Sequence, residues 1–166
     1  MHPSCLRLLK ILMLDRGLQH DRAVNVLDVG SYDYNGTCRD VVKELLPNAL
    51  YVGIDLIEGP NVDLVHDIEK ARPQGYFDLI LCANMLEHCY NPHKAAENMI
   101  EALKPGGYII VTVPWDIPIH NRPDRWRISI DGMRVLFGHM DEFRTDFYPG
   151  DVIDTWAFGR APLERK

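Results

Sequence analysis

Three acidic side chains in the first half of the chain are placed where they could do chemistry. Asp28, Asp55 and Asp67 lie at the ends of three successive apolar runs. A carboxylate at the carboxyl tip of a strand can accept both hydroxyls of a ribose. An acid followed by an apolar residue, as in Asp67-Ile68, can bond an adenine amino group while the apolar side chain packs on the ring. Each acid alone could be a cap or a solvated loop residue, but together they favour a nucleoside site.

A glycine-containing loop follows the first apolar run. The segment VLDVGSYDYNG leaves a predicted strand at Val26, passes through Gly30 and Gly36, and leads into a predicted helix. Glycine lets a backbone turn sharply and approach a ligand where a side chain would interfere. Either glycine alone could be an ordinary turn residue. Combined with the three acids, the loop predicts one wall of a ligand site.

Short runs rich in Val, Ile and Leu alternate with helical patterns along the chain. Most of the runs lack polar alternation, which is typical of parallel strands covered on both faces. The expected strands are Ala23–Val29, Leu50–Ile54, Val62–Val65, Phe77–Cys82 and Tyr108–Val113. The expected helices are Pro3–Leu14, Thr37–Leu46, Pro92–Leu103 and Ser129–Phe137. This alternation predicts a doubly wound α/β fold.

The end of the chain breaks the alternation. Glu142–Tyr148 and Val152–Arg160 are separated by Pro149-Gly150-Asp151, which predicts a turn between two antiparallel strands. We therefore expect a mostly parallel seven-stranded sheet with a C-terminal antiparallel hairpin and helices on both faces. We expect residues 1–166 to form one domain, with an N-terminal helix at 3–14, a cofactor-binding half at 23–113, an acceptor-side loop and helix at 114–138, and a strand pair at 142–160.

Composition excludes several classes of protein. The 166 residues carry a net charge of −6, which argues against attachment to a nucleic-acid backbone. A local basic patch of Arg122, Arg125, Arg127 and Arg134 is one alternative, and ordinary solvated charges are the other. No apolar run approaches the roughly 20 residues that cross a bilayer, so we expect a cytoplasmic protein. The four cysteines are scattered, which predicts reduced thiols, with Cys82 in the core, and no metal site.

Three motifs together resemble the class I, Rossmann-like methyltransferases that use S-adenosylmethionine, and the resemblance covers residues 25–160. They are VLDVGSYDYNG, YVGIDL, and the run FDLILCANMLEHCYNPHKAAENMIEALKPGGYIIVTVP. The resemblance implies S-adenosylmethionine as cofactor and S-adenosylhomocysteine as product. Tyr32 and Tyr34 stand where the commonest first motif has glycines, so the path of that loop departs from the family pattern.

The resemblance also implies a role for each cofactor-site residue. Asp28 and Gly30 would shape the methionine and ribose pocket, Asp55 would hold the ribose, and Asp67 with Ile68 would hold the adenine. Residues after the fourth strand would border the sulfonium. The cofactor-binding set is Asp28, Gly30, Ser31, Gly36, Asp55, Leu56, Asp67, Ile68, Ala83, Asn84 and Met85.

Two histidines follow the fourth and fifth predicted strands, where this fold places a methyl acceptor. A hydroxyl acceptor benefits from a general base, and histidine suits that role near neutral pH. His88 and His120 are therefore the catalytic candidates, although either could be a structural or solvated residue. The stretch HNRPDRWR resembles an element of methyltransferases associated with glycan biosynthesis. The substrate-site candidates are Trp115, Asp116, His120, Asn121, Trp126 and Arg127.

These observations predict a methyltransferase that acts on a hydroxyl of a small molecule or sugar. An N- or C-methyltransferase and a catalytically inactive regulatory module that binds the cofactor are the alternatives. A nicotinamide-dependent oxidoreductase is disfavoured because the chain lacks the GxGxxG fingerprint. A homodimer or a partner subunit that completes the acceptor pocket stays open, and nucleic acid and membrane are not expected as partners.

Overall fold

The structure is a computed structural model that describes residues 3–71 and 74–164. Seven strands and four α-helices are found in these residues, with two short 3-10 turns. In chain order the elements are α1 (Pro3–Asp15), β1 (Asn25–Val29), α2 (Cys38–Leu45), β2 (Leu50–Asp55), β3 (Leu64–Val65), η1 (Ile68–Lys70), β4 (Phe77–Ala83), η2 (Leu86–His88), α3 (Pro92–Ala102), β5 (Leu103–Pro114), α4 (Ile130–Phe137), β6 (Asp141–Pro149) and β7 (Ile153–Arg160).

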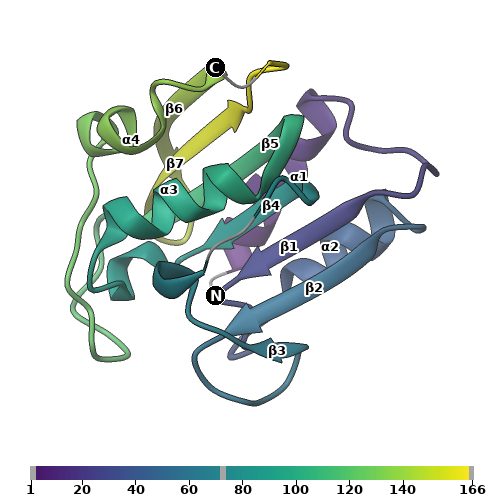
Figure 1. Cartoon of the computed structure of the whole chain (residues 1–166). Coiled ribbons are helices and arrows are strands. Elements are labelled where there is room, and N and C mark those ends of the chain that lie inside the picture. Colours follow the sequence, from purple (N-terminus) through teal and green to yellow (C-terminus); the bar gives the residue numbers. More distant parts are fainter. Residues whose placement is uncertain (1–2, 72–73, 165–166) are drawn as a thin grey trace.

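The strands form one sheet in the order β3-β2-β1-β4-β5-β7-β6 (Figure 1). The pairs from β3 to β5 are parallel, and β7 is antiparallel to both β5 and β6. Strand order therefore reverses between β1 and β4, where an open α/β sheet leaves a crevice at the carboxyl ends of its strands. The predicted sheet, with its parallel part and C-terminal hairpin, is confirmed.

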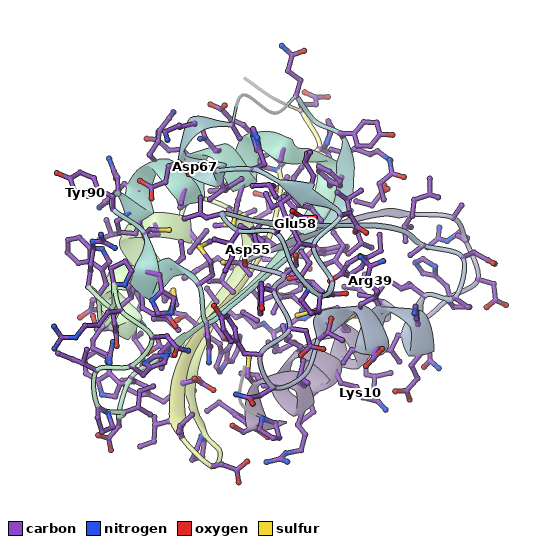
Figure 2. The ribbon with its side chains drawn as sticks, turned by 90° about the horizontal axis from the view of Figure 1, so that it is seen from below. Lys10, Arg39, Asp55, Glu58, Asp67 and Tyr90 are labelled. Carbon is purple, nitrogen blue, oxygen red and sulfur yellow. The ribbon has the colours of Figure 1, made fainter. Side chains whose placement is uncertain are left out.

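Helices cover both faces of the sheet, as predicted. On one face α1 and α2 pack with alternate strand residues such as Val26 and Leu81, and on the other α3 and α4 pack with Leu27 and Ile80. In Figure 2, Lys10 and Arg39 mark the side of α1 and α2, while Asp67 and Tyr90 lie toward the opposite side. Because both faces are buried, the central strands are mainly apolar rather than alternating with polar residues, although β1 includes the buried Asp28.

Each helix after the first begins at a residue that can cap it. Thr37, Asn91 and Ser129 each accept a hydrogen bond from a backbone N–H in the first turn of α2, α3 and α4. Such caps satisfy backbone donors that have no partner inside the helix. The Asn91-Pro92 start predicted for α3 is confirmed.

The end of α3 differs from the prediction. The helix stops at Ala102 rather than at Leu103, and β5 begins directly at Leu103, five residues before the expected start at Tyr108. At this end the N–H groups of Gly75 and Tyr76 donate to the carbonyls of Glu101 and Ala102, which have no partner inside the helix. The glycine pair that was expected to end the helix lies inside the strand, where the register with β4 is irregular.

The four cysteines are all free and buried, with Cys82 in the core as predicted. Across the described residues no helix is both long and apolar enough to cross a bilayer.

The packing of α3 on the sheet predicts a large effect of truncating Met99, whose side chain is fully buried. We expect Met99→Ala to lower the free energy of unfolding by about 2–5 kcal/mol, since it leaves a cavity. Val135 on α4 is 66% exposed, so Val135→Ala should change it by less than about 0.5 kcal/mol. Urea unfolding measures both values, and an equal effect of the two variants would contradict this packing.

Candidate active site

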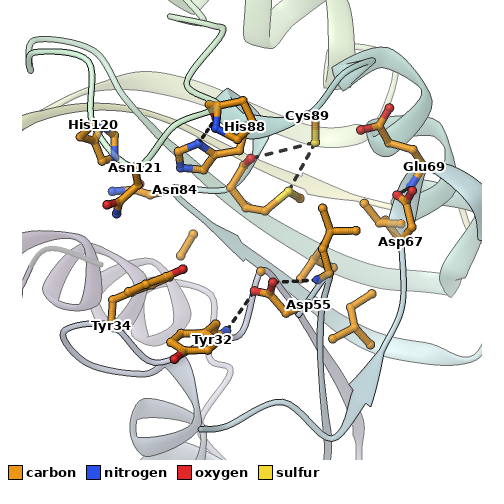
Figure 3. Close-up of a pocket in the computed structure, with 18 of the residues that line it drawn as sticks. Tyr32, Tyr34, Asp55, Asp67, Glu69, Asn84, His88, Cys89, His120 and Asn121 are labelled. Carbon is orange, nitrogen blue, oxygen red and sulfur yellow. Dashed lines mark hydrogen bonds between the residues drawn. The ribbon is translucent and has the colours of Figure 1, made fainter. Parts of the chain in front are cut away.

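A cavity of about 340 Å³ opens at the carboxyl ends of β1, β2 and β4. This volume is within the range of roughly 300–1,000 Å³ that is typical of small-molecule sites. Acidic residues lie toward one end of the cavity and the two histidines toward the other (Figure 3). The predicted site residues that line it are Gly30, Asp55, Leu56, Asp67, Ile68, Ala83, Asn84, Met85, His88, His120 and Asn121.

Asp55 is the last residue of β2, and backbone N–H groups fix its carboxylate. Oδ1 accepts hydrogen bonds from the N–H groups of Leu56 at 2.7 Å and Ile57 at 3.4 Å, and Oδ2 accepts one from the N–H of Tyr32 at 3.2 Å. Oδ2 therefore has a second lone pair that can accept a hydrogen bond from a ligand in the cavity. Backbone hydrogen bonds therefore fix the orientation of the carboxylate and leave it able to accept a hydrogen bond from a ligand.

Asp67 and Ile68 form the far wall of the acidic end. Asp67 caps the 3-10 turn η1 through a 2.9 Å hydrogen bond from the N–H of Glu69. The carbonyl of Ile68 accepts a 2.7 Å hydrogen bond from the buried side chain of Asn98. Glu69 in turn accepts the N–H groups of Tyr90 and Asn91, and this ties η1 to the start of α3. The acid and its apolar neighbour thus occupy fixed positions.

The loop after β1 passes under the middle of the cavity. Gly30 has a positive φ of 81°, and a Cβ there would come within 2.5 Å of the Met85 side chain. Both the conformation and the close approach require glycine. Tyr32 and Tyr34, which depart from the family pattern, both line the cavity with their rings 4.5 Å apart. The tyrosines therefore form part of the cavity wall without closing it.

Asn84 follows β4 and also adopts a positive φ, of 52°. Its backbone N–H donates to the Thr112 carbonyl at 2.9 Å, and its side-chain oxygen accepts the Thr112 hydroxyl at 2.7 Å. Both bonds bind the end of β4 to β5. They hold the backbone of Ala83 and Met85 against the cavity, between its two ends.

The imidazole of His88 has a defined tautomer. Its Nδ1 lies 2.6 Å from the carbonyl oxygen of Pro123. A carbonyl oxygen can only accept, so Nδ1 carries the proton and Nε2 has a lone pair in the neutral ring. Nε2 lies 3.5 Å from a carboxylate oxygen of Glu87.

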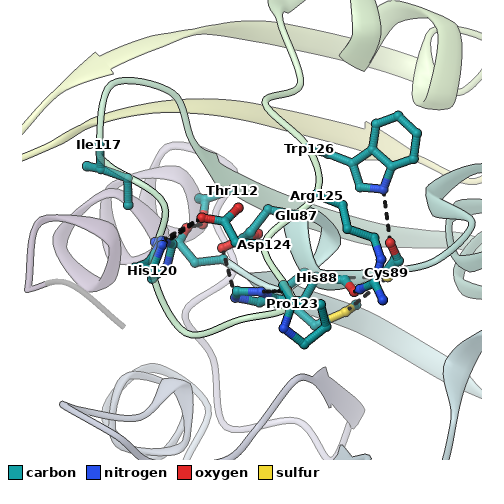
Figure 4. Close-up of polar contacts among 12 residues, drawn as sticks. Glu87, His88, Cys89, Thr112, Ile117, His120, Pro123, Asp124, Arg125 and Trp126 are labelled. Carbon is teal, nitrogen blue, oxygen red and sulfur yellow. Dashed lines mark hydrogen bonds and ion pairs between the residues drawn. The ribbon is translucent and has the colours of Figure 1, made fainter.

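His120 lies beside a partly buried ion pair. Its Nδ1 lies 3.1 Å from Oδ2 of Asp124, and its backbone N–H donates to the same oxygen at 2.9 Å. Two guanidinium nitrogens of Arg127 bind the Asp124 carboxylate at 2.5 and 2.9 Å. These hydrogen bonds hold the pKa of Asp124 well below its usual range. The two histidine rings are 5.5 Å apart, edge to face (Figure 4).

Glu87 lies beneath the two histidines and is completely buried. Its backbone carbonyl accepts the N–H groups of Arg125 and Trp126. In contrast, neither carboxylate oxygen accepts a hydrogen bond from another described residue. Burial raises the pKa of Glu87 to about 8, because removal from water disfavours the charged form.

Three predicted cofactor residues do not line the cavity. Asp28 is buried below it and accepts a hydrogen bond from the Tyr51 hydroxyl. Ser31 is buried against Gly53, where a Cβ would come within 2.6 Å of its hydroxyl. Gly36 has a φ of 123° and closes a turn by donating to Asp33. All three support the loop from behind rather than face a ligand.

Four predicted substrate residues also lie outside the cavity. The Trp115 ring packs on Phe147, and Asp116 is exposed. Trp126 donates to the carbonyl of Cys89 at 2.9 Å, and Arg127 binds Asp124. The stretch HNRPDRWR thus contributes His120 and Asn121 to the cavity, while Trp126 and Arg127 anchor the loop. Because Arg127 is paired with Asp124, the structure gives little support to the basic patch of four arginines considered from the sequence.

The sequence alone did not single out Glu87, Asp124 or Glu69. Glu87 and Asp124 belong to motifs that were recognised, LEH and HNRPDRWR, but nothing in a sequence distinguishes a buried acid from a solvated one. The neighbouring histidine in each motif is the only signal that could have pointed to them.

Comparisons with known proteins give a family and a fold. A family model described as a methyltransferase domain matches residues 5–149. The structure of the N-methyltransferase NodS from Bradyrhizobium japonicum WM9 is similar with a TM-score of 0.68 at 19% identity, covering 96% of this chain and 98% of that one.

Two further structures are similar at low identity. The 1,6-didemethyltoxoflavin-N1-methyltransferase of Burkholderia thailandensis, solved with S-adenosylhomocysteine, has a TM-score of 0.68 at 17% identity and coverage of 95% and 78%. A SAM dependent methyltransferase from Archaeoglobus fulgidus has a TM-score of 0.70 at 12% identity and coverage of 93% and 94%. At such identities the likeness establishes the shared fold.

Burial of Asp28 predicts a specific dependence of stability on pH. Desolvation raises the pKa of this carboxyl to about 6, although the Tyr51 hydrogen bond opposes the rise. In the unfolded chain the pKa of an aspartate is about 3.9. The contribution of Asp28 to folding stability is therefore complete below about pH 4 and is lost as pH rises through about 6. A difference of about two in pKa corresponds to about 3 kcal/mol.

We therefore expect Asp28→Asn to remove this loss, so that the variant gains stability relative to wild type as pH rises from 4 to 7. Urea unfolding across this range measures the difference, and the exposed Asp40→Asn serves as the control. Parallel pH profiles for wild type and Asp28→Asn would contradict the assignment.

Proposed function

Because the chain belongs to the methyltransferase domain family, we propose that it transfers a methyl group from S-adenosylmethionine to a hydroxyl of a small molecule or sugar. The observation that carries the proposal is the cavity, in which an acidic nucleoside end and a histidine end are continuous. A methyl donor and its acceptor must meet in one such space, since the transfer is an in-line displacement.

The acidic end suits the cofactor. Oδ2 of Asp55 has a free lone pair for a ribose hydroxyl, and Asp67 with Ile68 offers an acceptor beside an apolar surface for adenine. In this arrangement Ala83, Asn84 and Met85 line the same cavity as Asp55 and the two histidines. The fixed backbone at these residues suits the positioning of a sulfonium. Its positively charged sulfur makes the methyl carbon electrophilic, so that this carbon accepts the electron pair of the nucleophile as the carbon–sulfur pair returns to sulfur.

The histidine end suits a hydroxyl acceptor. An imidazole can accept the hydroxyl proton as the methyl is transferred. The ionised Asp124 beside His120 stabilises the imidazolium that then forms, and Arg127 keeps Asp124 in place. His88 contributes a second unprotonated nitrogen close by.

The lining also suits a neutral acceptor. Among the described residues, no Lys or Arg lines the cavity. A phosphorylated or carboxylated acceptor would have no cationic partner there, whereas the polar side chains of Asn121 and the two histidines can hydrogen-bond to hydroxyl groups. This favours a small polar molecule or an uncharged sugar.

Two expectations stay predictions: that residues 1–166 form one domain and that the protein is cytoplasmic. A homodimer, and a partner subunit that completes the acceptor pocket, stay open alternatives.

Cofactor binding is tested by titrating S-adenosylmethionine and S-adenosylhomocysteine calorimetrically into wild type and Asp55→Ala. We expect saturable binding by wild type and a loss of at least tenfold in the variant, about 1.4 kcal/mol, because the ribose loses its acceptor. Asp40→Ala removes an exposed carboxylate away from the cavity and should bind as wild type does. No binding by folded wild type would overturn the proposal.

Acceptor chemistry is tested by screening neutral sugars and amines for methyl transfer. We expect sugars or related hydroxyl compounds to be methylated, and His120→Ala to lower kcat by a factor of about 10²–10⁴ with cofactor affinity unchanged. The exposed His139→Ala is the matched control. Turnover of amines alone would indicate an N-methyltransferase, and cofactor binding without any turnover would indicate a regulatory module; either result contradicts O-methylation.

A further inference from the structure

Three potential metal ligands meet at the histidine end of the cavity. One oxygen of Glu87 and one ring nitrogen each of His88 and His120 all lie within 4.8 Å of one another. Nε2 of His88 and Oε1 of Glu87 are 3.5 Å apart. Ligand atoms about 2.0–2.2 Å from a tetrahedral zinc are about 3.4 Å from one another, so this pair already has the required spacing.

Surrounding groups hold the two histidines in place from behind. The Pro123 carbonyl fixes the proton of His88 on Nδ1 and turns the lone pair of Nε2 toward Glu87. Asp124, fixed by Arg127, contacts the ring and the backbone of His120. Carbonyl and carboxylate partners of this kind typically orient histidines that bind metals.

The buried carboxylate of Glu87 provides the second, independent observation. It is inaccessible to solvent, and neither of its oxygens accepts a hydrogen bond from another described residue. A buried polar group without a partner costs free energy. A cation placed between Glu87 and the two imidazoles would offset this cost directly.

We propose that Glu87, His88 and His120 bind a divalent transition-metal cation, such as Zn²⁺, at the acceptor end of the cavity. Two imidazoles and one carboxylate make up a ligand set found in zinc enzymes, and imidazole favours zinc over magnesium. His88 and His120 line the cavity, so a three-ligand site leaves a coordination position facing it. The sequence had predicted no metal because its four cysteines lack ligand spacing.

This inference rests on the proposed function, and it changes the role of His88 and His120 from general bases to metal ligands. An acceptor hydroxyl at the open position would become more acidic, as zinc-bound water does. Its proton would pass to water, and its oxygen would form the new bond to the methyl carbon while the carbon–sulfur bond breaks. The histidines would then hold the cation rather than take the proton themselves.

The test is a calorimetric titration of Zn²⁺ into protein that has been treated with a chelator and dialysed. We expect one saturable site in wild type, an affinity at least tenfold lower in Glu87→Gln and in His120→Ala, and no change in His139→Ala. Mg²⁺ should not bind at this site. Titration of S-adenosylmethionine into each variant shows whether it has folded and does not depend on the metal.

Two results would overturn the metal site. One is the absence of a saturable zinc site, and the other is a site whose affinity is the same in Glu87→Gln, His120→Ala and wild type. In either case, methyl transfer that persists in chelator would leave the O-methyltransferase proposal intact, with His120 as a direct base. Zinc binding that follows the expected pattern, without binding of S-adenosylmethionine, would leave the metal site and remove the proposed function.

Discussion

The position of β1 between β2 and β4 determines the rest of the site. The register pairs Val29 with Ile54 on one side and with Cys82 on the other, which brings the ends of three strands to one edge. The carbonyl of Ile54 then accepts the N–H groups of both Gly30 and Ser31, so the loop after β1 is fastened to the neighbouring strand. A slip of one residue in this pairing would turn Asp55 to the opposite face of the sheet.

The histidine end depends on a different kind of interaction. Its loop has no regular secondary structure between Trp115 and Ser129, and the partly buried pair of Asp124 and Arg127 gives it a fixed shape. Arg127 also donates to the carbonyl of Ile117, across the base of the loop. A bidentate pair of this kind has a defined geometry as well as charge-assisted hydrogen bonds. A strongly bound carboxylate thus supports a less regular backbone.

The fold could be predicted from the sequence because each signal was local. Apolar runs, the caps at Thr37 and Asn91, and the turn before β7 specify elements without knowledge of their neighbours. The prediction of a methyltransferase is confirmed by the family match, and it rested on motifs rather than on single residues. The early start of β5 at Leu103 was missed because it depends on pairing with Phe77 of β4, a long-range contact that no local signal shows.

The sequence located the site residues at strand ends better than those in the loop after β5, for a physical reason. Residues at strand ends, such as Asp55 and Asn84, could be placed because a parallel sheet collects its carboxyl ends at one edge. In the loop after β5, by contrast, side-chain direction depends on tertiary contacts. Trp126 and Arg127 look like recognition residues in sequence, yet both turn toward the protein. Glu87 could not be distinguished from a solvated acid, because its burial results from that same loop.

The contacts of Arg125 and Trp126 also bear on how ligands exchange. Their N–H groups share the Glu87 carbonyl, and their side chains donate to the carbonyls of His88 and Cys89. The turn at residues 86–89 and the loop that covers it are therefore one rigid unit. The opposite rim of the cavity includes Tyr34 and Val152, and no backbone hydrogen bond among the described residues ties them to that unit. This rim is the part of the lining that a ligand could displace without breaking the contacts of Arg125 and Trp126.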